Sequence, residues 1–286
     1  MIAPDWIKKA IPRRKYAKPL KSKLHSLRLH TICEEAKCPN IGDCFSRGTA
    51  TFLIMGNICT RCCGFCAVKS GLPHSFDLDE PLRVALEVTN LNLKHVVLTS
   101  PSRDDLVDGG ASYYKEVVKA IKKRNPHTTV EVLIPDFKGD LNALIEIIDS
   151  GIDVLNHNIE TVPRLYPIVR PEADYELSLN LLKEASLYTP SLPLKSGLIV
   201  GLGEEKEEIL SVMRDLREVN CKILTIGQYL RSSKELLRVK RYVHPEEFIE
   251  YRTLGVKMGF DYIASSPLVR SSYMAEEALR IYLERK

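Results

Sequence analysis

The chain has 286 residues, of which 44% are hydrophobic and 27% are charged, and its formal net charge is +4. These values are typical of a water-soluble globular protein, and a chain of this length buries about three quarters of its unfolded surface without needing disulfides. No apolar run approaches the ~20 residues that span a bilayer, and residues 1–21 contain no apolar segment like that of a signal peptide. We therefore expect a cytoplasmic protein that does not bind a membrane.

The positive charge is concentrated near the N-terminus, where residues 1–28 contain nine Lys or Arg and one acid. One interpretation is a solvated arm that wraps the domain, and the other is a contact for an acidic partner protein. We expect no nucleic-acid binding, because Trp6 and Tyr16 are the only aromatic residues interleaved with these charges. We also expect the chain to be a monomer.

From about residue 50 onward, short β-branched runs alternate with amphipathic stretches. The runs predict strands at Thr51–Met55, His95–Thr99, Val130–Ile134, Asp153–Asn156, Leu194–Val200, Ile223–Gly227 and Tyr262–Ser265. Apolar residues three and four apart predict helices at Ala111–Arg124, Leu141–Ile148, Tyr175–Leu187, Glu205–Val219 and Pro245–Met258.

Strand–helix alternation of this kind gives a parallel sheet, and six such units favour a barrel over a flat doubly wound sheet. We therefore predict an α/β fold, a partial (β/α)6 TIM-like barrel with N- and C-terminal extensions. The predicted domains are the N-terminal extension 1–48, the barrel 49–266 and the C-terminal extension 267–286.

Seven of the eight cysteines lie between residues 33 and 66. They include two triplets, C-x4-C-x5-C at Cys33, Cys38 and Cys44, and C-x3-C-x2-C at Cys59, Cys63 and Cys66. Disulfides are disfavoured without a secretion signal, and structural zinc usually takes paired C-x2-C knuckles that sum to four ligands. Thiolate triplets favour cubane iron–sulfur clusters, because three thiolates leave one of the four irons open. Zinc and redox thiols remain the alternatives.

The position of each triplet indicates its role. The second triplet follows the first predicted strand, and in a parallel barrel the loops after the strands form the active-site face. The first triplet precedes the barrel, so its cluster belongs to the N-terminal extension. We expect Cys62 to be a bystander that points away from the cluster, and Cys221 to lie in the core.

Seven segments carry a resemblance to a known family. The C-x3-C-x2-C spacing after a first barrel strand is similar to the signature of the radical S-adenosylmethionine superfamily. More narrowly, the chain resembles the lipoyl synthase family from about Pro4 to Ala275, in the segments CEEAKCPNIGDCF, NICTRCCGFCAV, TSPSRDDLVDGG, NHNIETVPRLYPIVRP, KSGLIVGLGE, GQYLR and VRSSYMA.

The resemblance implies a radical sulfurtransferase that inserts two sulfur atoms at carbons six and eight of an octanoyl group. That group is amide-linked to a lysine of a lipoyl carrier domain, in acyltransferase subunits of 2-oxoacid dehydrogenases or in the glycine cleavage H protein. The implied cofactors are two [4Fe–4S] clusters and S-adenosylmethionine. Implied partners are an electron donor such as ferredoxin or flavodoxin, and an iron–sulfur carrier that rebuilds the second cluster.

The resemblance also assigns roles to residues. Cys59, Cys63 and Cys66 hold the cluster that cleaves S-adenosylmethionine to a 5′-deoxyadenosyl radical. The cluster on Cys33, Cys38 and Cys44 supplies the sulfur. Its fourth iron needs a ligand that can leave, and we favour Ser272 over Ser271 for this catalytic role, with the two extensions meeting over the barrel. The alternative is that these serines cap a helix.

Polar residues after the predicted strands are candidates for contact with S-adenosylmethionine. They are Asp104, Asp105, Gly109, Asn156, Asn158, Glu160 and Arg170. The alternatives are loop hydrogen bonding and helix capping, or for Arg170 an ion pair on the surface. Gly201 and Gly203 are interpreted as turn glycines, because GLGEE lacks the lysine of a phosphate-binding loop.

Two other functions remain open. One is a different sulfur-inserting or methylthiolating radical S-adenosylmethionine enzyme with an auxiliary cluster. The other is a non-catalytic iron–sulfur electron carrier, in which every iron would normally have its own thiolate.

Overall fold

The computed structural model describes residues 4–12, 18–75 and 77–285, which form two compact units. Unit 1 comprises the described residues of Met1–Ile11, Cys62–Cys66 and Asn156–Lys286, and unit 2 those of Pro12–Arg61 and Ala67–Leu155. The basic residues Arg13, Arg14 and Lys15 of the predicted arm lie outside the described residues. The division into 1–48, 49–266 and 267–286 stays a prediction.

Unit 2 contains a mostly parallel sheet. Its strand order is β1 (His30–Thr31), β2 (Thr51–Leu53), β5 (His95–Thr99), β6 (Thr129–Leu133) and β7 (Val154–Asn156), the last of which ends at the boundary with unit 1. Strands β2, β5 and β6 are parallel, and β1 pairs antiparallel with β2. All five residues of β5 are buried, as expected for a parallel strand that is covered on both faces.

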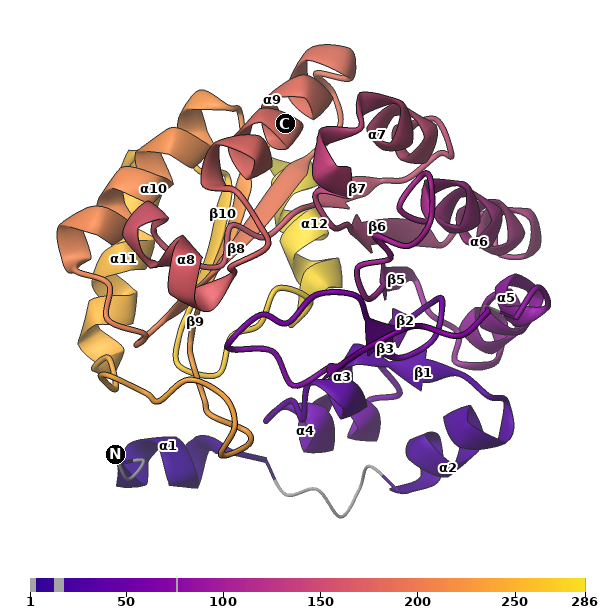
Figure 1. Ribbon diagram of the computed structural model, residues 1–286, viewed down its shortest axis with the longest axis horizontal. Coiled ribbons are helices and arrows are strands. Elements are labelled where there is room, and N and C mark those ends of the chain that lie inside the picture. Colours follow the sequence, from indigo (N-terminus) through magenta and orange to yellow (C-terminus); the bar gives the residue numbers. More distant parts are fainter. Residues whose placement is uncertain (1–3, 13–17, 76, 286) are drawn as a thin grey trace. The chain divides into compact units, whose positions relative to one another are not determined.

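The helices of unit 2 fall into two groups. The first group precedes β2 and consists of α2 (Lys18–Ser26), α3 (Ile32–Glu35) and α4 (Ile41–Ser46). The short strand β1 lies between α2 and α3. The second follows the strands and consists of α5 (Glu80–Asn90), α6 (Ala111–Arg124), the 3-10 turn η2 (Phe137–Gly139) and α7 (Leu141–Ile148). Helices α5, α6 and α7 lie side by side, beside the strands that they connect (Figure 1). A separate two-stranded ladder joins β3 (Ile58–Cys59) to β4 (Lys69–Ser70).

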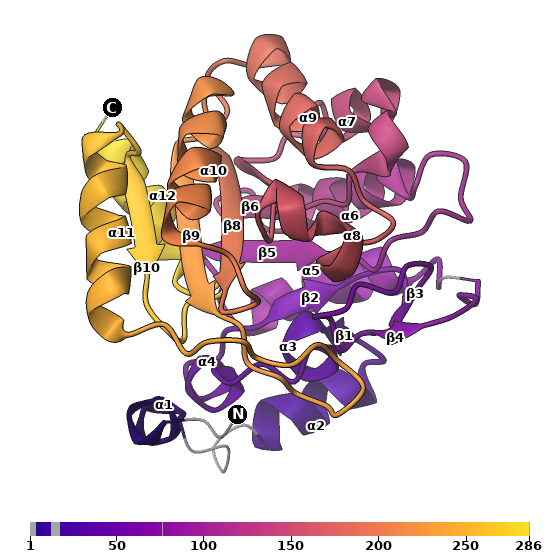
Figure 2. The same cartoon turned by 60° about the vertical axis from the view of Figure 1, so that its left-hand side comes forward.

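Unit 1 contains three parallel strands, β8 (Leu194–Val200), β9 (Ile223–Gln228) and β10 (Tyr262–Ser265). Its helices are α1 (Asp5–Ala10), η3 (Pro163–Leu165), α8 (Tyr166–Val169), α9 (Tyr175–Tyr188), α10 (Lys206–Glu218), α11 (Pro245–Lys257) and α12 (Ala275–Glu284). Figures 1 and 2 show α10 and α11 along one side of these strands. Among the described residues, no helix combines the length and hydrophobicity needed to cross a membrane.

The predicted α/β fold is confirmed, since all seven predicted strands and all five predicted helices form. Strand β2 is shorter than predicted and ends at Leu53, because Met55 has a left-handed backbone with φ of 65°. Helix α5 was not predicted, although Pro81, Val84, Ala85 and Val88 have the spacing of a buried helix face.

Two glycines with nearly the same backbone φ test how tightly unit 2 is packed. Gly110, which precedes α6, has φ of 93°, and Gly151 has φ of 91°. A Cβ on Gly110 would lie 2.5 Å from Met55 Sδ, whereas a Cβ on Gly151 would have nothing within 4 Å. We expect Gly151→Ala to lower the free energy of unfolding by about 1–2 kcal/mol, the cost of the left-handed backbone. Gly110→Ala should cost about 1–3 kcal/mol more, because it overpacks the core.

Urea unfolding of the two variants measures this difference. Equal losses would contradict the prediction and would mean that the Met55 side chain moves aside.

Candidate functional site

The first cysteine triplet comes together within unit 2. Cys33 lies in the first turn of α3, Cys44 lies in α4, and the Cys38 amide donates a hydrogen bond to the Cys33 carbonyl at 2.9 Å. Burial, together with the neighbouring Cys38, raises the pKa of Cys33 to about 12 and that of Cys44 to about 11. The three sulfurs are thus close enough to interact electrostatically. The raised pKa values favour the protonated thiols of Cys33 and Cys44, so a metal that binds them must displace their protons.

Cys59 ends β3, in unit 2, and its sulfur accepts two backbone hydrogen bonds. The donors are the amides of Arg61 at 3.4 Å and Ser102 at 3.3 Å. Hydrogen bonds of this kind to a ligand sulfur help to set the reduction potential of an iron–sulfur cluster. The surroundings of Cys59 therefore suit a thiolate ligand of such a cluster.

The other cysteines of this loop belong to unit 1. The Cys66 amide donates to the Cys63 carbonyl at 3.1 Å, and between them the Gly64 amide donates to the Val169 carbonyl at 2.9 Å. Cys62 is exposed and its amide binds the Glu172 carboxylate at 2.7 Å. Across the described parts of the chain, no three His, Cys, Asp or Glu side chains are arranged to hold a single metal ion. A cubane cluster makes a different demand, because each thiolate binds a separate iron.

A buried arginine ties the cysteine loop to the ends of two strands. Arg61 is 6% exposed and binds Asp104 through Nε at 2.7 Å and Nη2 at 2.8 Å. The same guanidinium binds Asp136, which is 1% exposed, through Nη1 and Nη2 at 2.6 Å each. Burial opposes the charge on Arg61, but hydrogen bonds to both carboxylates outweigh it and raise the pKa of the guanidinium. Asp104 follows β5 and Asp136 follows β6, so this arginine holds two strand ends at once.

Three of the predicted contacts to S-adenosylmethionine lie after β5, in unit 2. Asp104 binds Arg61 and the Thr60 hydroxyl at 2.9 Å, and although burial opposes its charge, the arginine lowers its pKa. Asp105 binds Arg103 through both carboxylate oxygens, at 2.9 and 2.8 Å. Gly109 has φ of 60°, and a Cβ there would lie 2.7 Å from the Phe137 ring.

Three other predicted contacts come together in unit 1. Asn158 Nδ2 donates to Glu160 at 2.9 Å, and Arg170 Nη1 donates to the Asn158 carbonyl at 3.0 Å. Asn158 Oδ1 is buried without a hydrogen-bond partner among the described residues. Gly197 leaves room for it, because a Cβ there would approach this oxygen to 2.8 Å. The orphaned oxygen is a polar group that a ligand can satisfy.

Glu160 and Arg170 have features of a binding site. Glu160 has φ of 67°, a strained conformation for a residue other than glycine. Burial raises its pKa, and the positive charge of Arg170 acts in the opposite direction. Arg170 is buried, so the alternative of a surface ion pair is wrong. Asn156, at the end of β7, is fully buried.

Ser271 and Ser272 lie in the turn before α12. The helix begins after Met274, and no side chain caps it, so the alternative of a serine cap is wrong. Within residues 4–12, 18–75 and 77–285, neither serine side chain makes a hydrogen bond. Both hydroxyls are therefore available for a ligand.

Two structural interpretations are confirmed. Cys221 is fully buried and its thiol lies 3.4 Å from the Ile223 carbonyl. The Gly201 amide binds the Glu204 carboxylate, and the Leu202 amide binds it at 2.9 Å. Because the chain's own carboxylate occupies the amides that a phosphate would need, Gly201 is a turn glycine.

Two polar residues of the site were not singled out from the sequence. Arg61 stands two residues after Cys59, and its sequence signal is only that proximity. Gln228, the last residue of β9, is fully buried, and its amide nitrogen donates to the carbonyls of Val200, Tyr229 and Arg241 at 3.0–3.1 Å. The sequence signal for Gln228 was a polar residue at the end of an apolar strand.

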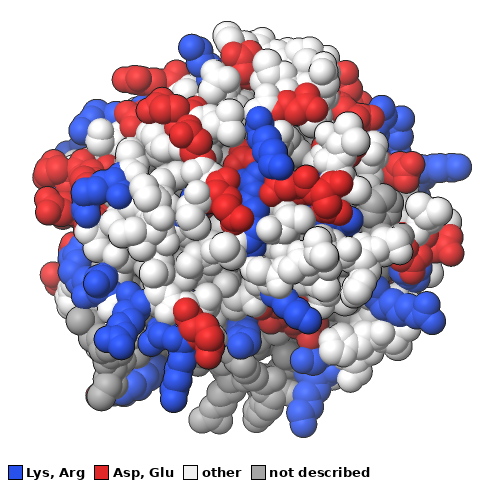
Figure 3. Space-filling view, viewed as in Figure 1, with Lys and Arg blue, Asp and Glu red and all other residues white. Residues whose placement is uncertain are grey.

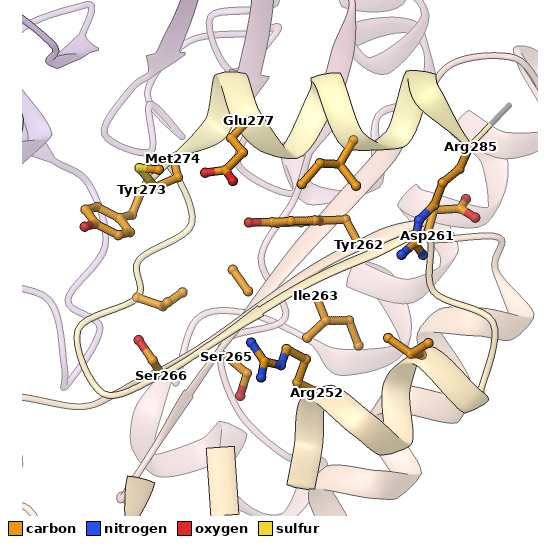
Figure 4. A pocket seen from close by; sticks show the side chains of 14 residues that line it. Arg252, Asp261, Tyr262, Ile263, Ser265, Ser266, Tyr273, Met274, Glu277 and Arg285 are labelled. Atoms are coloured by element: carbon orange, nitrogen blue, oxygen red, sulfur yellow. The ribbon is translucent and has the colours of Figure 1, made fainter. Parts of the chain in front are cut away.

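A cavity of about 450 Å³ lies along β10 between α11 and α12 (Figure 4). Its walls include Tyr262, Ser265, Tyr273 and Glu277. None of the cysteines and none of the predicted contacts to S-adenosylmethionine lines it. This cavity is therefore distinct from the candidate site.

The arginine between the two carboxylates yields a test that needs no cofactor. We expect Arg61→Met to lower the free energy of unfolding by about 3–5 kcal/mol, because it leaves Asp136 charged and buried without its cation. Adding Asp136→Asn should recover part of that loss, since a neutral amide is cheaper to bury. The deficit of the single variant should also shrink as the pH falls, because a protonated Asp136 carries no charge.

Urea unfolding of the cluster-free protein measures all three effects. A single variant as stable as the parent would contradict the role given to Arg61.

Two family models match the chain. Residues 53–216 match the model of the radical SAM superfamily, and residues 2–38 match that of the N-terminal domain of lipoyl synthase. A lipoyl synthase from Rubrobacter xylanophilus is 53% identical over 274 residues, which cover 96% of this chain and 85% of that protein. A lipoyl synthase from Caldicellulosiruptor saccharolyticus is 51% identical over 278 residues, which cover 97% of this chain and 98% of that protein.

Solved structures share the fold. The crystal structure of methylornithine synthase matches with a TM-score of 0.57 and 13% identity, covering 90% of this chain and 88% of that one. HydG, a maturase of the [FeFe]-hydrogenase, matches with a TM-score of 0.61 and 15% identity, covering 96% of this chain and 68% of that one. These likenesses concern the fold, which is the mostly parallel α/β arrangement of a radical SAM partial barrel. By its family models and its full-length relatives, the chain belongs to the lipoyl synthase family of the radical SAM superfamily.

Proposed function

We propose that the chain inserts two sulfur atoms at carbons six and eight of an octanoyl group that is amide-linked to a lysine of a lipoyl carrier domain. One observation carries this proposal. The chain contains both cysteine triplets, and two relatives named lipoyl synthase match at least 96% of it with 51–53% identical residues. That combination favours lipoyl formation over methylthiolation and over simple electron transfer.

The superfamily uses S-adenosylmethionine and a [4Fe–4S] cluster. In our proposal Cys59, Cys63 and Cys66 each bind one iron, and the fourth iron is left to S-adenosylmethionine. When bound, this pair supplies a 5′-deoxyadenosyl radical, which can attack the unactivated C–H bonds that acid–base chemistry cannot. The chain's part is to fix the ligands, and the amides of Arg61 and Ser102 do so at the Cys59 sulfur.

In our proposal, Cys33, Cys38 and Cys44 hold a second [4Fe–4S] cluster, which is the source of the sulfur. The donor set fits, since three soft thiolates lie near one another in the short segment from α3 to α4. Burial of Cys33 keeps water from this side of the cluster. We propose Ser272 as the ligand of the fourth iron, because its hydroxyl is a harder and weaker ligand than a thiolate and is more easily released.

Two sets of residues are proposed to contact S-adenosylmethionine: Asn156, Asn158, Glu160 and Arg170 in unit 1, and Asp104, Asp105 and Gly109 in unit 2. Asn158 Oδ1 accepts from the ligand, and the strained Glu160 carboxylate receives its cationic amine. The positive charge of Arg170 opposes the rise that burial causes in the pKa of Glu160, and so favours the carboxylate form. Asp104 and Asp105 already bind arginines, so their part is to shape the loop.

We further propose that the carriers are the acyltransferase subunits of 2-oxoacid dehydrogenases and the glycine cleavage H protein. A ferredoxin or flavodoxin supplies electrons, and an iron–sulfur carrier rebuilds the second cluster. We place this monomeric enzyme in the cytoplasm.

The two triplets are expected to separate radical formation from sulfur insertion. Protein reconstituted under anaerobic conditions should hold about eight irons per chain, and with S-adenosylmethionine, dithionite and an octanoyl-lysyl peptide it should add two sulfurs to the peptide. Cys63→Ala should abolish cleavage of S-adenosylmethionine. Cys38→Ala should keep that cleavage yet insert no sulfur. Mass spectrometry of the peptide and chromatography of 5′-deoxyadenosine measure both.

The matched control is Cys62→Ala, which should change neither reaction. A peptide that gains a methylthio group, or no sulfur at all, would refute the proposed function. Equal cleavage by the Cys63→Ala and Cys38→Ala variants would refute the division of labour.

The role of Ser272 is tested against its neighbour. Ser272→Ala should leave S-adenosylmethionine cleavage intact and slow lipoyl formation more than about tenfold, as expected for loss of a metal-site ligand. Ser272→Cys should keep the full iron content and still release sulfur slowly, because the thiolate binds iron more firmly. Ser271→Ala is the control and should resemble the parent. Iron analysis and the electron paramagnetic resonance spectrum of the second cluster report the ligand change, and a spectrum altered only by Ser271→Ala would reassign the ligand.

A further inference from the structure

The loop from residue 229 to residue 244, between β9 and α11, presents a basic surface. Arg231, Lys234, Arg238 and Lys240 are exposed on this loop, and its one acid, Glu235, is bound to Ser233. A fifth cation, Arg241, is paired with Glu247 at 2.7 Å. We call the residues 229–244 the basic loop.

The basic loop has no helix or strand, yet it is held firmly at both ends. The Tyr229 hydroxyl donates to the Leu237 carbonyl at 2.8 Å, and Arg231 Nε donates to the Leu236 carbonyl at 2.9 Å. At the other end the buried Gln228 donates to the Arg241 carbonyl at 3.0 Å and accepts from the Val243 amide at 2.8 Å. The exposed cations therefore stand on a fixed backbone, and little order has to be gained when a partner binds.

The basic loop lies directly on the segment that carries two of the cluster cysteines. The Leu237 amide donates to the Gly64 carbonyl at 2.9 Å, and Gly64 stands between Cys63 and Cys66. A Cβ on Gly64 would lie 2.9 Å from the Leu237 side chain and 3.0 Å from the Ile168 carbonyl, so a larger residue would force this contact to shift. A protein bound to the basic loop would therefore be next to the Cys62–Cys66 segment.

The N-terminal helix extends the positive charge. Trp6 packs edge-on against His244 with ring centroids 6.4 Å apart, and Ile7 is 1% exposed. Helix α1 thereby brings Lys8 and Lys9 to the basic loop, with Asp5 paired to Lys8 at 3.3 Å. Figure 3 shows Lys and Arg side chains gathered at the lower left, where Figure 1 places α1 and the basic loop.

We propose that the basic loop and α1 form the docking surface for an acidic face of the octanoylated carrier domain. This inference rests on the proposed function and names the surface that selects its substrate. The reacting carbons sit at the end of a lysyl arm, so the body of the carrier stays outside the site while the arm enters. A fixed cationic surface beside the Cys62–Cys66 segment attracts an acidic carrier and sets the direction of its lysyl arm.

The test compares a whole carrier domain with a short peptide that bears the same octanoyl-lysine. The loop variant is Lys234→Glu, Arg238→Glu and Lys240→Glu, three exposed side chains outside the proposed catalytic groups. The control variant is Lys119→Glu, Lys123→Glu and Lys183→Glu, three exposed side chains on α6 and α9 with the same change of net charge. Binding of an octanoylated H protein is measured by fluorescence anisotropy, and turnover of both substrates by mass spectrometry.

We expect the loop variant to weaken binding of the carrier domain at least tenfold at low salt and to flatten its salt dependence. Turnover of the peptide and cleavage of S-adenosylmethionine should stay within about twofold of the parent, and the control variant should resemble the parent throughout.

Equal carrier binding by the loop and control variants would overturn the docking proposal. An equal loss of turnover with the peptide would also overturn it, because that loss would mean local damage to the site. So would a loop variant that loses oligonucleotide binding while its binding of the carrier is unchanged. Failure of the parent to modify the peptide would instead refute the proposed function, while the anisotropy measurement would still decide the docking surface.

Discussion

The pairing of one buried guanidinium with two carboxylates organises the candidate site in unit 2. Arg61 donates four charge-assisted hydrogen bonds to Asp104 and Asp136, which follow neighbouring parallel strands. Because the carboxyl ends of parallel strands meet at one edge of a sheet, a single arginine reaches both. Any chain segment attached to that arginine is fixed with respect to the strands. The segment in question carries Cys59, whose sulfur then meets the amides of Arg61 and Ser102.

Unit 1 uses the same principle with different side chains. Polar groups at or after the ends of β7 and β9, namely Asn158, Glu160 and Gln228, are buried or half-buried and bind backbone or one another. Gln228 fixes the end of the basic loop through Arg241 and Val243, while Glu160 is held in a strained conformation. Rigid strands thus supply the fixed positions, and loops supply the chemistry.

A reaction on a group tethered to another protein makes two demands on the enzyme. The reacting centre must exclude water and hold soft ligands, whereas the surface around it must bind a large hydrophilic partner. In the arrangement that we propose, the two demands meet at Gly64, which lies between two cysteines and accepts a hydrogen bond from the basic loop. The absence of a Cβ there lets the charged surface lie against the cysteine segment.

The sequence alone determined the order of strands and helices, because the hydrophobic periods of two and 3.6 residues are local patterns. It also determined the two cysteine triplets, because their spacing is local too. It also placed Cys221 in the core and Gly201 in a turn. It did not reveal that Arg61 binds Asp104 and Asp136, that Arg170 is buried, or that no serine caps α12. Arg61 is 43 and 75 positions from its two partners. Such pairs form only when the strands come together, so the tertiary structure decided which polar residues meet, because no local pattern specifies a contact between distant segments.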